Sequence, residues 1–199
     1  MRVVVDQDGG VQQDPGWKFT WRSFPYTFVP QYAIQRAAKK PGYNALAFVR
    51  QMFLSYCVSL AAVTVVVFIL AGPVEPEEPQ TALAVGIVAA VGIGGLIAGR
   101  WLNRRLDCSS DETLAASYQT RFFLRVAFAE SAALGGFALS IALGPGWVYF
   151  LGLGFAAVGM FRLAPTHRRL EAEQSELAAN GCHRSLSRAL SAQPIAAGR

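Results

Sequence analysis

The sequence predicts an all-α integral membrane protein, a bundle of four transmembrane helices with the N-terminus and C-terminus in the cytoplasm. Of its 199 residues, 53% are hydrophobic and only 16% are charged. Soluble domains average about 25% charged residues. The charges cluster between long stretches that carry almost none, and Lys and Arg flank those stretches on alternate sides. These three observations place the chain in the membrane class.

The first predicted span covers residues 51–71 and contains no charged residue. A helix needs about 20 such residues to cross a hydrocarbon core about 30 Å thick. The segment that follows, GPVEPEEPQ, is rich in proline and glutamate, so we expect a turn outside the bilayer. This first apolar run is too long for the core of a signal peptide, and further spans follow it, so we expect no secretory signal peptide.

The second predicted span covers residues 81–99 and is also uncharged. It ends at Arg100 and Trp101, residue types suited to the headgroup region. A polar loop follows, in which Ser109, Ser110 and Asp111 have the character of residues that begin a helix.

The third predicted span, residues 122–143, contains the charged Arg125 and Glu130. The fourth, residues 147–163, is short, but it suffices if the Arg162 side chain extends back to the surface. Residues 51–164 are thus the predicted membrane domain. The segment 165–199 is predicted to hold a cytoplasmic helix, HRRLEAEQSELAANG, that stops at Asn180-Gly181.

Basic residues predict the orientation. They precede the first span, occupy the loop between the second and third spans, and follow the fourth, whereas the other two loops contain none. Because cytoplasmic loops carry an excess of Lys and Arg, both termini and the middle loop are expected in the cytoplasm of a cell-membrane protein. The residues are Arg36, Lys39, Lys40, Arg50, Arg100, Arg104, Arg105, Arg121, Arg162, Arg168 and Arg169.

The N-terminal segment, residues 1–50, is unusually aromatic. The alternation WKFTW admits a short strand. We favour rings that lie at the headgroup level, held by Lys18 and Arg22, with docking on the chain's own loops and a partner site as alternatives. The aromatic residues are Trp17, Phe19, Trp21, Phe24, Tyr26, Phe28 and Tyr32.

Small residues recur along the second and third spans. Membrane helices associate through close backbone contact, which small side chains permit. We therefore expect these two spans to form the tight core of the bundle. The predicted helix-packing residues are Gly86, Ala90, Gly94, Gly95, Ala98, Gly99, Gly135 and Gly136.

Glu130 is the candidate functional residue. Ionisable groups inside membrane segments are costly and usually face the bundle interior or water. One interpretation is therefore a proton-binding or cation-binding carboxylate. The other is a structural hydrogen bond to another span, with Ser59 and Thr64 as candidate partners, and a contact with another subunit is a third. Glu130 follows Arg125 by five residues, too far round the helix for the two to pair.

Cysteines and motifs provide little chemistry. There are three cysteines, which is an odd number, and by the predicted topology Cys108 and Cys182 face the cytoplasm, where thiols stay reduced. Catalytic motifs such as HExxH, GxSxG and a P-loop are absent from the sequence. We expect neither a metal, a cofactor nor a nucleic-acid partner, and we expect His167 and His183 to be surface residues.

Two classes of function remain. The first is a non-enzymatic assembly or accessory subunit that binds the lipid bilayer and either a protein partner or further copies of itself. It accounts for the small-residue surfaces, the aromatic N-terminal segment and the C-terminal helix. The second is a small transporter or ion-conducting element in which Glu130 binds the proton or cation.

Overall fold

The computed structural model describes residues 4–5, 11–12, 17, 20–21, 44–70, 78–101, 106–143 and 146–192. Within these ranges the chain is almost wholly helical, as the sequence predicts, and the only strands are β1 (Val4–Val5) and β2 (Val11–Gln12). The chain forms two compact units. The bundle unit comprises Tyr56–Arg105 and Thr120–Ala164, and the terminal unit comprises Met1–Ser55, Leu106–Gln119 and Pro165–Arg199.

Three helices are long and apolar enough to cross a bilayer: α3 (Ala45–Leu70), α4 (Glu78–Trp101) and α5 (Asp111–Leu143). The fourth predicted span is α6 (Trp147–Leu163), which meets the same criterion only when it is joined to α7 (His167–Ala179) across a bend. The described chain therefore has three to four candidate membrane spans, which supports a location in a membrane.

Two helices begin more than one turn earlier than the hydropathy of the sequence indicates. α3 starts at Ala45, after Asn44 accepts a hydrogen bond from the Ala47 amide at 2.9 Å through its side chain. α5 starts at Asp111 and has 33 residues, a length of roughly 50 Å against a hydrocarbon core of about 30 Å. Hydropathy locates only the apolar part of such a helix, because its polar first turns read as a loop.

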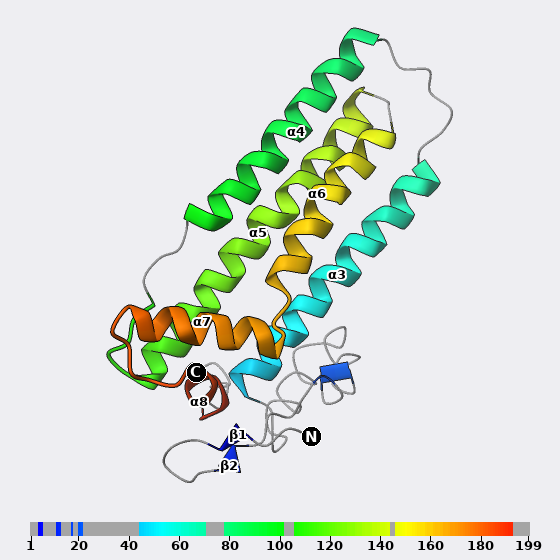
Figure 1. Cartoon of the computed structure of the whole chain (residues 1–199). Coiled ribbons are helices and arrows are strands. Elements are labelled where there is room, and N and C mark those ends of the chain that lie inside the picture. The colour runs from blue at the N-terminus through cyan, green and yellow to red at the C-terminus, as the bar shows by residue number, and fades with distance from the viewer. Residues whose placement is uncertain are drawn as a thin grey trace. The chain divides into compact units, whose positions relative to one another are not determined.

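The helices of the bundle unit lie side by side, as Figure 1 shows. Ala84 and Val88 of α4 pack with Val148 of α6 in the apolar core, and Leu96 of α4 lies opposite Gly159 of α6. Residues early in α4 contact residues early in α6, and residues late in α4 contact residues late in α6, so these two helices run in the same direction. Consecutive helices run in opposite directions, as in an up-and-down bundle.

Along α5 and α6, higher residue numbers on one helix contact lower residue numbers on the other, so these two helices run in opposite directions. Gly152 of α6 lies against Ala132 of α5, and Gly136 of α5 lies against Tyr149 of α6.

The outer faces of all four helices expose large apolar side chains, as expected for surfaces that meet lipid tails. Examples are Val65, Phe68, Ile69, Leu83, Ile93, Ile97, Leu134, Ile141, Phe150 and Phe161.

In the terminal unit, β1 and β2 pair in antiparallel fashion, with Val5 opposite Val11. The predicted C-terminal helix is confirmed as α7, which begins after Thr166 and ends at Ala179. A further helix, α8 (Leu186–Ala192), lies in a tail for which the sequence indicates no structure. Its buried residues Leu186, Ala189 and Leu190 occur at helical spacing, but the segment is too short for that periodicity to be recognised.

Most of the aromatic N-terminal segment lies outside the described residues. Trp17, Thr20 and Trp21 are helical, which does not agree with the strand that the WKFTW alternation admits. The Trp17 ring meets the Phe53 ring edge-on, with centroids 6.4 Å apart, whereas Trp21 is 60% exposed. The Trp17 ring is therefore docked on the chain itself.

Candidate functional site

Glu130 is the only acidic residue within the four predicted spans, and it lies on α5 in the bundle unit. Its side chain is half-buried, and its charge interacts electrostatically with Tyr56 and Cys57 of α3. Among the described residues it forms no hydrogen bond and no ion pair. The two helices thus place a carboxyl within electrostatic range of a phenol and a thiol.

The two partners suggested for Glu130 do not bind it. Ser59 is exposed. The Thr64 hydroxyl donates to the Leu60 carbonyl at 2.8 Å and lies 2.8 Å from the Tyr149 hydroxyl. This correction has a simple cause: spacing along α3 identifies polar residues, but it does not show which way the helix is turned.

The hydrogen bond between Thr64 and Tyr149 connects α3 to α6. Tyr149 is fully buried; its hydroxyl lies 2.8 Å from the Thr64 hydroxyl and 3.2 Å from the Leu60 carbonyl, and its single hydrogen serves one of these two acceptors at a time. A buried hydroxyl without a partner would be costly, so this cluster fixes the approach of the two helices. Sequence reasoning missed Tyr149, because a tyrosine near the end of a span reads as a residue of the headgroup region.

Some of the predicted small-residue positions do make close contacts. A Cβ added to Gly95 would lie 2.6 Å from the Phe128 carbonyl oxygen of α5, and one added to Gly136 would lie 3.1 Å from the Tyr149 Cα. On the fourth span, the pair Gly152 and Ala156 is also a predicted small-residue surface, and Gly152 lies against the Ala132 backbone. Two glycines that the sequence reasoning passed over are just as close to a neighbour, Gly92 against Phe155 and Gly159 against Ala129.

The stripe predicted to pack along α4 instead faces away from the other described helices. Gly86, Ala90 and Gly94 are exposed, and a Cβ added to Gly86 or Gly94 would meet no described atom within 4 Å. A Cβ added to Gly99 or to Gly135 of α5 would also meet no described atom within 4 Å, although these two glycines, like Ala98, are half-buried. The contacts inside the bundle use the neighbouring face of α4, which carries Ala84, Val88, Gly92 and Gly95.

A disulfide joins Cys108 to Cys182, 74 residues apart in the sequence, with the two Cα atoms 6.0 Å apart. The expectation of two separate thiols is therefore corrected, because the structure brings these two cysteines close enough to bond. An odd cysteine count concealed the pair, because Cys57 is the free one. Both residues belong to the terminal unit, where Cys182 is buried.

Local hydrogen bonds hold the turn that carries Cys108. The Ser109 amide donates to the Asp107 carboxylate at 3.0 Å, and this bond, together with one from the Ser109 side chain, lowers the pKa of Asp107. Ser110 and Thr113 then bond reciprocally, each side chain accepting from the other's amide at 3.1 and 3.0 Å. This is a capped helix start, as predicted for these serines.

The turn that carries Cys182 ends α7. Gly181 has a φ of +82°, and the Cys182 amide donates to the Leu177 carbonyl at 3.0 Å while the Gly181 amide donates to that of Ala178 at 3.0 Å. This is the Schellman arrangement that glycine permits after a helix. The helix stop predicted at Asn180-Gly181 is confirmed, and it directs the chain so that Cys182 is buried.

Arg50 is a further residue that the sequence assigned to the membrane surface. It is instead fully buried in the terminal unit. Its guanidinium lies 5.4 Å from the centroid of the Trp17 ring, and its Nε donates to the Pro165 carbonyl at 3.5 Å. Arg50 thus joins the start of α3 to the segment that precedes α7.

Among the described residues, no group of three His, Cys, Asp or Glu side chains is placed to hold a metal ion. Neither a protein-family model, nor a curated protein, nor a solved structure matches this chain. The geometry of the described residues is therefore the basis on which a function is proposed.

Proposed function

We propose that this chain is a multi-pass protein of the cell membrane with a non-enzymatic role, as an assembly or accessory subunit. The observation that supports this proposal is the division of α4 into two faces. One face, with Gly92 and Gly95, packs inside the bundle, while the other leaves Gly86, Ala90 and Gly94 open. Small residues every four positions allow another helix to approach closely in lipid.

In this proposal the chain crosses the membrane four times, with both termini in the cytoplasm. The alternation of arginine-rich and arginine-free loops supports this orientation. The open face of α4 then lies at the depth of the hydrocarbon core, where a second copy of the chain or a helix of a partner protein can meet it.

The assembly role predicts different results for Gly94→Leu and for Gly154→Leu. Both glycines are exposed, and a Cβ added to either meets no described atom within 4 Å. Gly94→Leu is expected to weaken association roughly tenfold, because helix contacts in membranes contribute about 1–2 kcal/mol. Gly154→Leu, the control on α6, is expected to leave association unchanged. The measurement is the mass of the purified complex in mild detergent over a dilution series.

Three results decide that experiment. A wild-type protein that is a single chain without co-purifying partners would remove the assembly proposal. Equal weakening by both variants would place the interface elsewhere than on the Gly86, Ala90 and Gly94 face. An assembly that loses mass only with Gly94→Leu would support the proposal.

A second candidate function has its own observation. Glu130 is half-buried in a candidate span and forms no hydrogen bond or ion pair among the described residues, so its carboxyl group is open to a proton or cation. A carboxyl group in apolar surroundings readily takes up a proton, because burial disfavours its charged form. This supports proton or cation handling as the alternative role.

For this alternative, Glu130→Gln is expected to reduce proton or cation flux into liposomes at least roughly tenfold, since the isosteric amide carries no exchangeable charge. Glu112→Gln, at an exposed position in the first turn of α5, is the matched control. Flux is measured with an internal pH-sensitive dye or a cation indicator. Equal flux in all three proteins would remove Glu130 as the site, and mass measurements on the same samples would show whether assembly is unaffected.

A further inference from the structure

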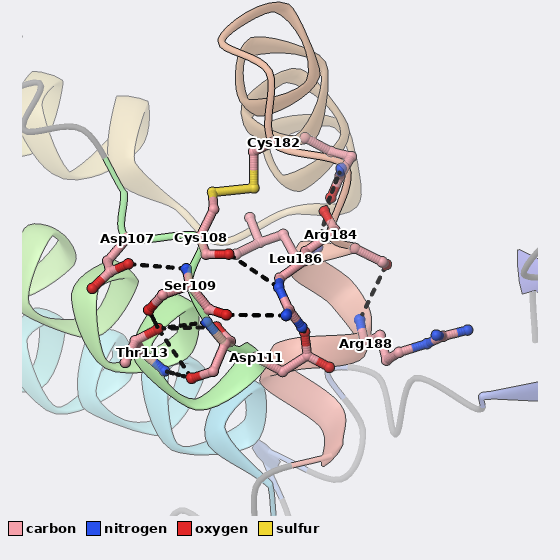
Figure 2. Close-up of polar contacts among 12 residues, drawn as sticks. Asp107, Cys108, Ser109, Asp111, Thr113, Cys182, Arg184, Leu186 and Arg188 are labelled. Carbon is pink, nitrogen blue, oxygen red and sulfur yellow. Dashed lines mark hydrogen bonds and ion pairs between the residues drawn. A yellow bond between two sulfur atoms is a disulfide. The ribbon is translucent and has the colours of Figure 1, made fainter.

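Cys108 and Cys182 form a site whose geometry is set by contacts other than the disulfide itself. Figure 2 shows the bond between the turn that precedes α5 and the turn that follows α7. Hydrogen bonds of Ser109, Ser110 and Thr113 hold the first turn. The bonds that end α7 hold the second. Each cysteine would therefore keep its local backbone conformation if the sulfur–sulfur bond opened.

Arg184 joins the two turns directly. As Figure 2 shows, its guanidinium donates to the carbonyls of Cys108 and Ser109, each at 3.0 Å, and forms a 2.8 Å ion pair with the Asp111 carboxylate. Charge-assisted hydrogen bonds of this kind are about twice as strong as neutral ones.

Gln174 of α7 holds the Arg184 backbone in turn. It donates to the Arg184 carbonyl at 3.0 Å and accepts from the Leu186 amide at 2.6 Å. The two thiols thus have a tether besides the disulfide and stay near each other when reduced.

The basic residues place this pair in a reducing compartment under the proposed topology. Arg104 and Arg105 precede the Cys108 turn in the sequence, and Arg168 and Arg169 lie on α7. Disulfides that form in the cytoplasm are usually transient and redox-sensing. Thiols held adjacent on that side of the membrane are suited to opening and closing.

We propose that Cys108 and Cys182 are a reversible thiol–disulfide site that closes when a small-molecule disulfide oxidises it. One thiolate attacks the small-molecule disulfide and forms a mixed disulfide, releasing one small thiol. The second cysteine thiolate then attacks its neighbour's sulfur and displaces the second small thiol. The two cysteines lose two protons and two electrons in total, and one small-molecule disulfide takes them up and is reduced to two thiols.

This inference rests on the proposed cytoplasmic orientation, so the experiment reads orientation and redox state separately. In a Cys57→Ser background, cells are quenched in acid and free thiols are tagged with a maleimide that adds mass. We expect two tags in untreated cells and none after brief exposure to dithiodipyridine, a membrane-permeant disulfide. Orientation is read from Glu171→Cys, at an exposed position of α7, placed in a chain that lacks the three native cysteines. We expect an impermeant maleimide to label it only after permeabilisation.

Each other result overturns the inference in a distinct way. If the pair is already oxidised in untreated cells and the reporter is labelled from outside, the orientation is the reverse of the proposed one and the disulfide is a permanent bond. The same oxidised pair with a cytoplasmic reporter would leave the orientation standing and remove the reversible site. Thiols that survive the oxidant would show that the two cysteines do not react as a pair.

Arg184→Ala tests the tether. Without the Arg184 guanidinium, closure of the disulfide by the same oxidant is expected to be roughly tenfold slower. A tenfold change corresponds to the loss of one charge-assisted hydrogen bond. Arg168→Ala, which removes an exposed cation from α7, is the control and is expected to close at the wild-type rate. Equal closure rates in all three proteins would show that Arg184 does not hold the thiols together.

Discussion

Gly152→Ala is expected to lower the free energy of unfolding by about 3 kcal/mol, near the top of the usual range for overpacking. A Cβ at this position would overlap the Ala132 carbonyl and approach the Ala133 Cα, both on α5. These are backbone atoms, so no side chain can rotate to make room. The methyl group therefore forces α5 and α6 apart, and the cost extends to the Thr64 and Tyr149 contact that joins α6 to α3.

Gly154→Ala is the matched control. Gly154 lies on the same helix, is exposed, and has no described atom within 4 Å of an added Cβ. Because alanine is a better helix former than glycine, this variant is expected to be neutral or more stable by less than about 1 kcal/mol. Thermal unfolding in detergent micelles, followed by circular dichroism, compares the two. Equal effects of the two substitutions would contradict the packing of α6 on α5.

Arg50→Met is expected to lower the free energy of unfolding by about 3 kcal/mol, which is the combined size of a desolvated cation–π contact and a charged hydrogen bond. Arg50 is fully buried, with its guanidinium over Trp17 and a bond to the Pro165 carbonyl. Methionine has a similar length but no donor and no charge. It leaves a buried carbonyl that has lost the Arg50 donor, which is the costly part of such a change.

Arg168→Met is the control for Arg50, because Arg168 is exposed on α7 and its replacement is expected to change stability by less than about 0.5 kcal/mol. Limited proteolysis gives a local readout. Cleavage in the connection before α7 should be faster in Arg50→Met and unchanged in Arg168→Met. Wild-type stability and cleavage in both variants would mean that Arg50 makes no net contribution.

The arrangement of cysteines illustrates where sequence reasoning is limited. Helix starts and stops depend on groups within a few residues, so Ser110 and Gly181 were recognisable as such. The pairing of Cys108 with Cys182 depends on two such local structures meeting across 74 residues. No pattern within either turn carries that information, and the odd number of cysteines argued against it.

For Glu130 as well, the sequence indicates the local surroundings but not the neighbours on other helices. That Glu130 lies in an apolar helix follows from composition alone. That it lies within electrostatic range of Tyr56 and Cys57, while Thr64 bonds to Tyr149, depends on how α3 and α5 are rotated against each other. Two polar residues on one helix are equally good candidates until that rotation is known.

By itself, the sequence determined the helical class, the apolar segments and the ends of several helices, because hydropathy and capping act over a few residues. Tertiary structure alone decided which glycines touch a neighbour. Gly94 and Gly95 are adjacent in sequence, yet an added Cβ meets no described atom within 4 Å at the first and meets the Phe128 carbonyl at the second. Each residue turns a helix by about 100°, so one step along the chain moves a side chain from an open face to a packed one. Which face of a helix packs depends on where the neighbouring helices lie.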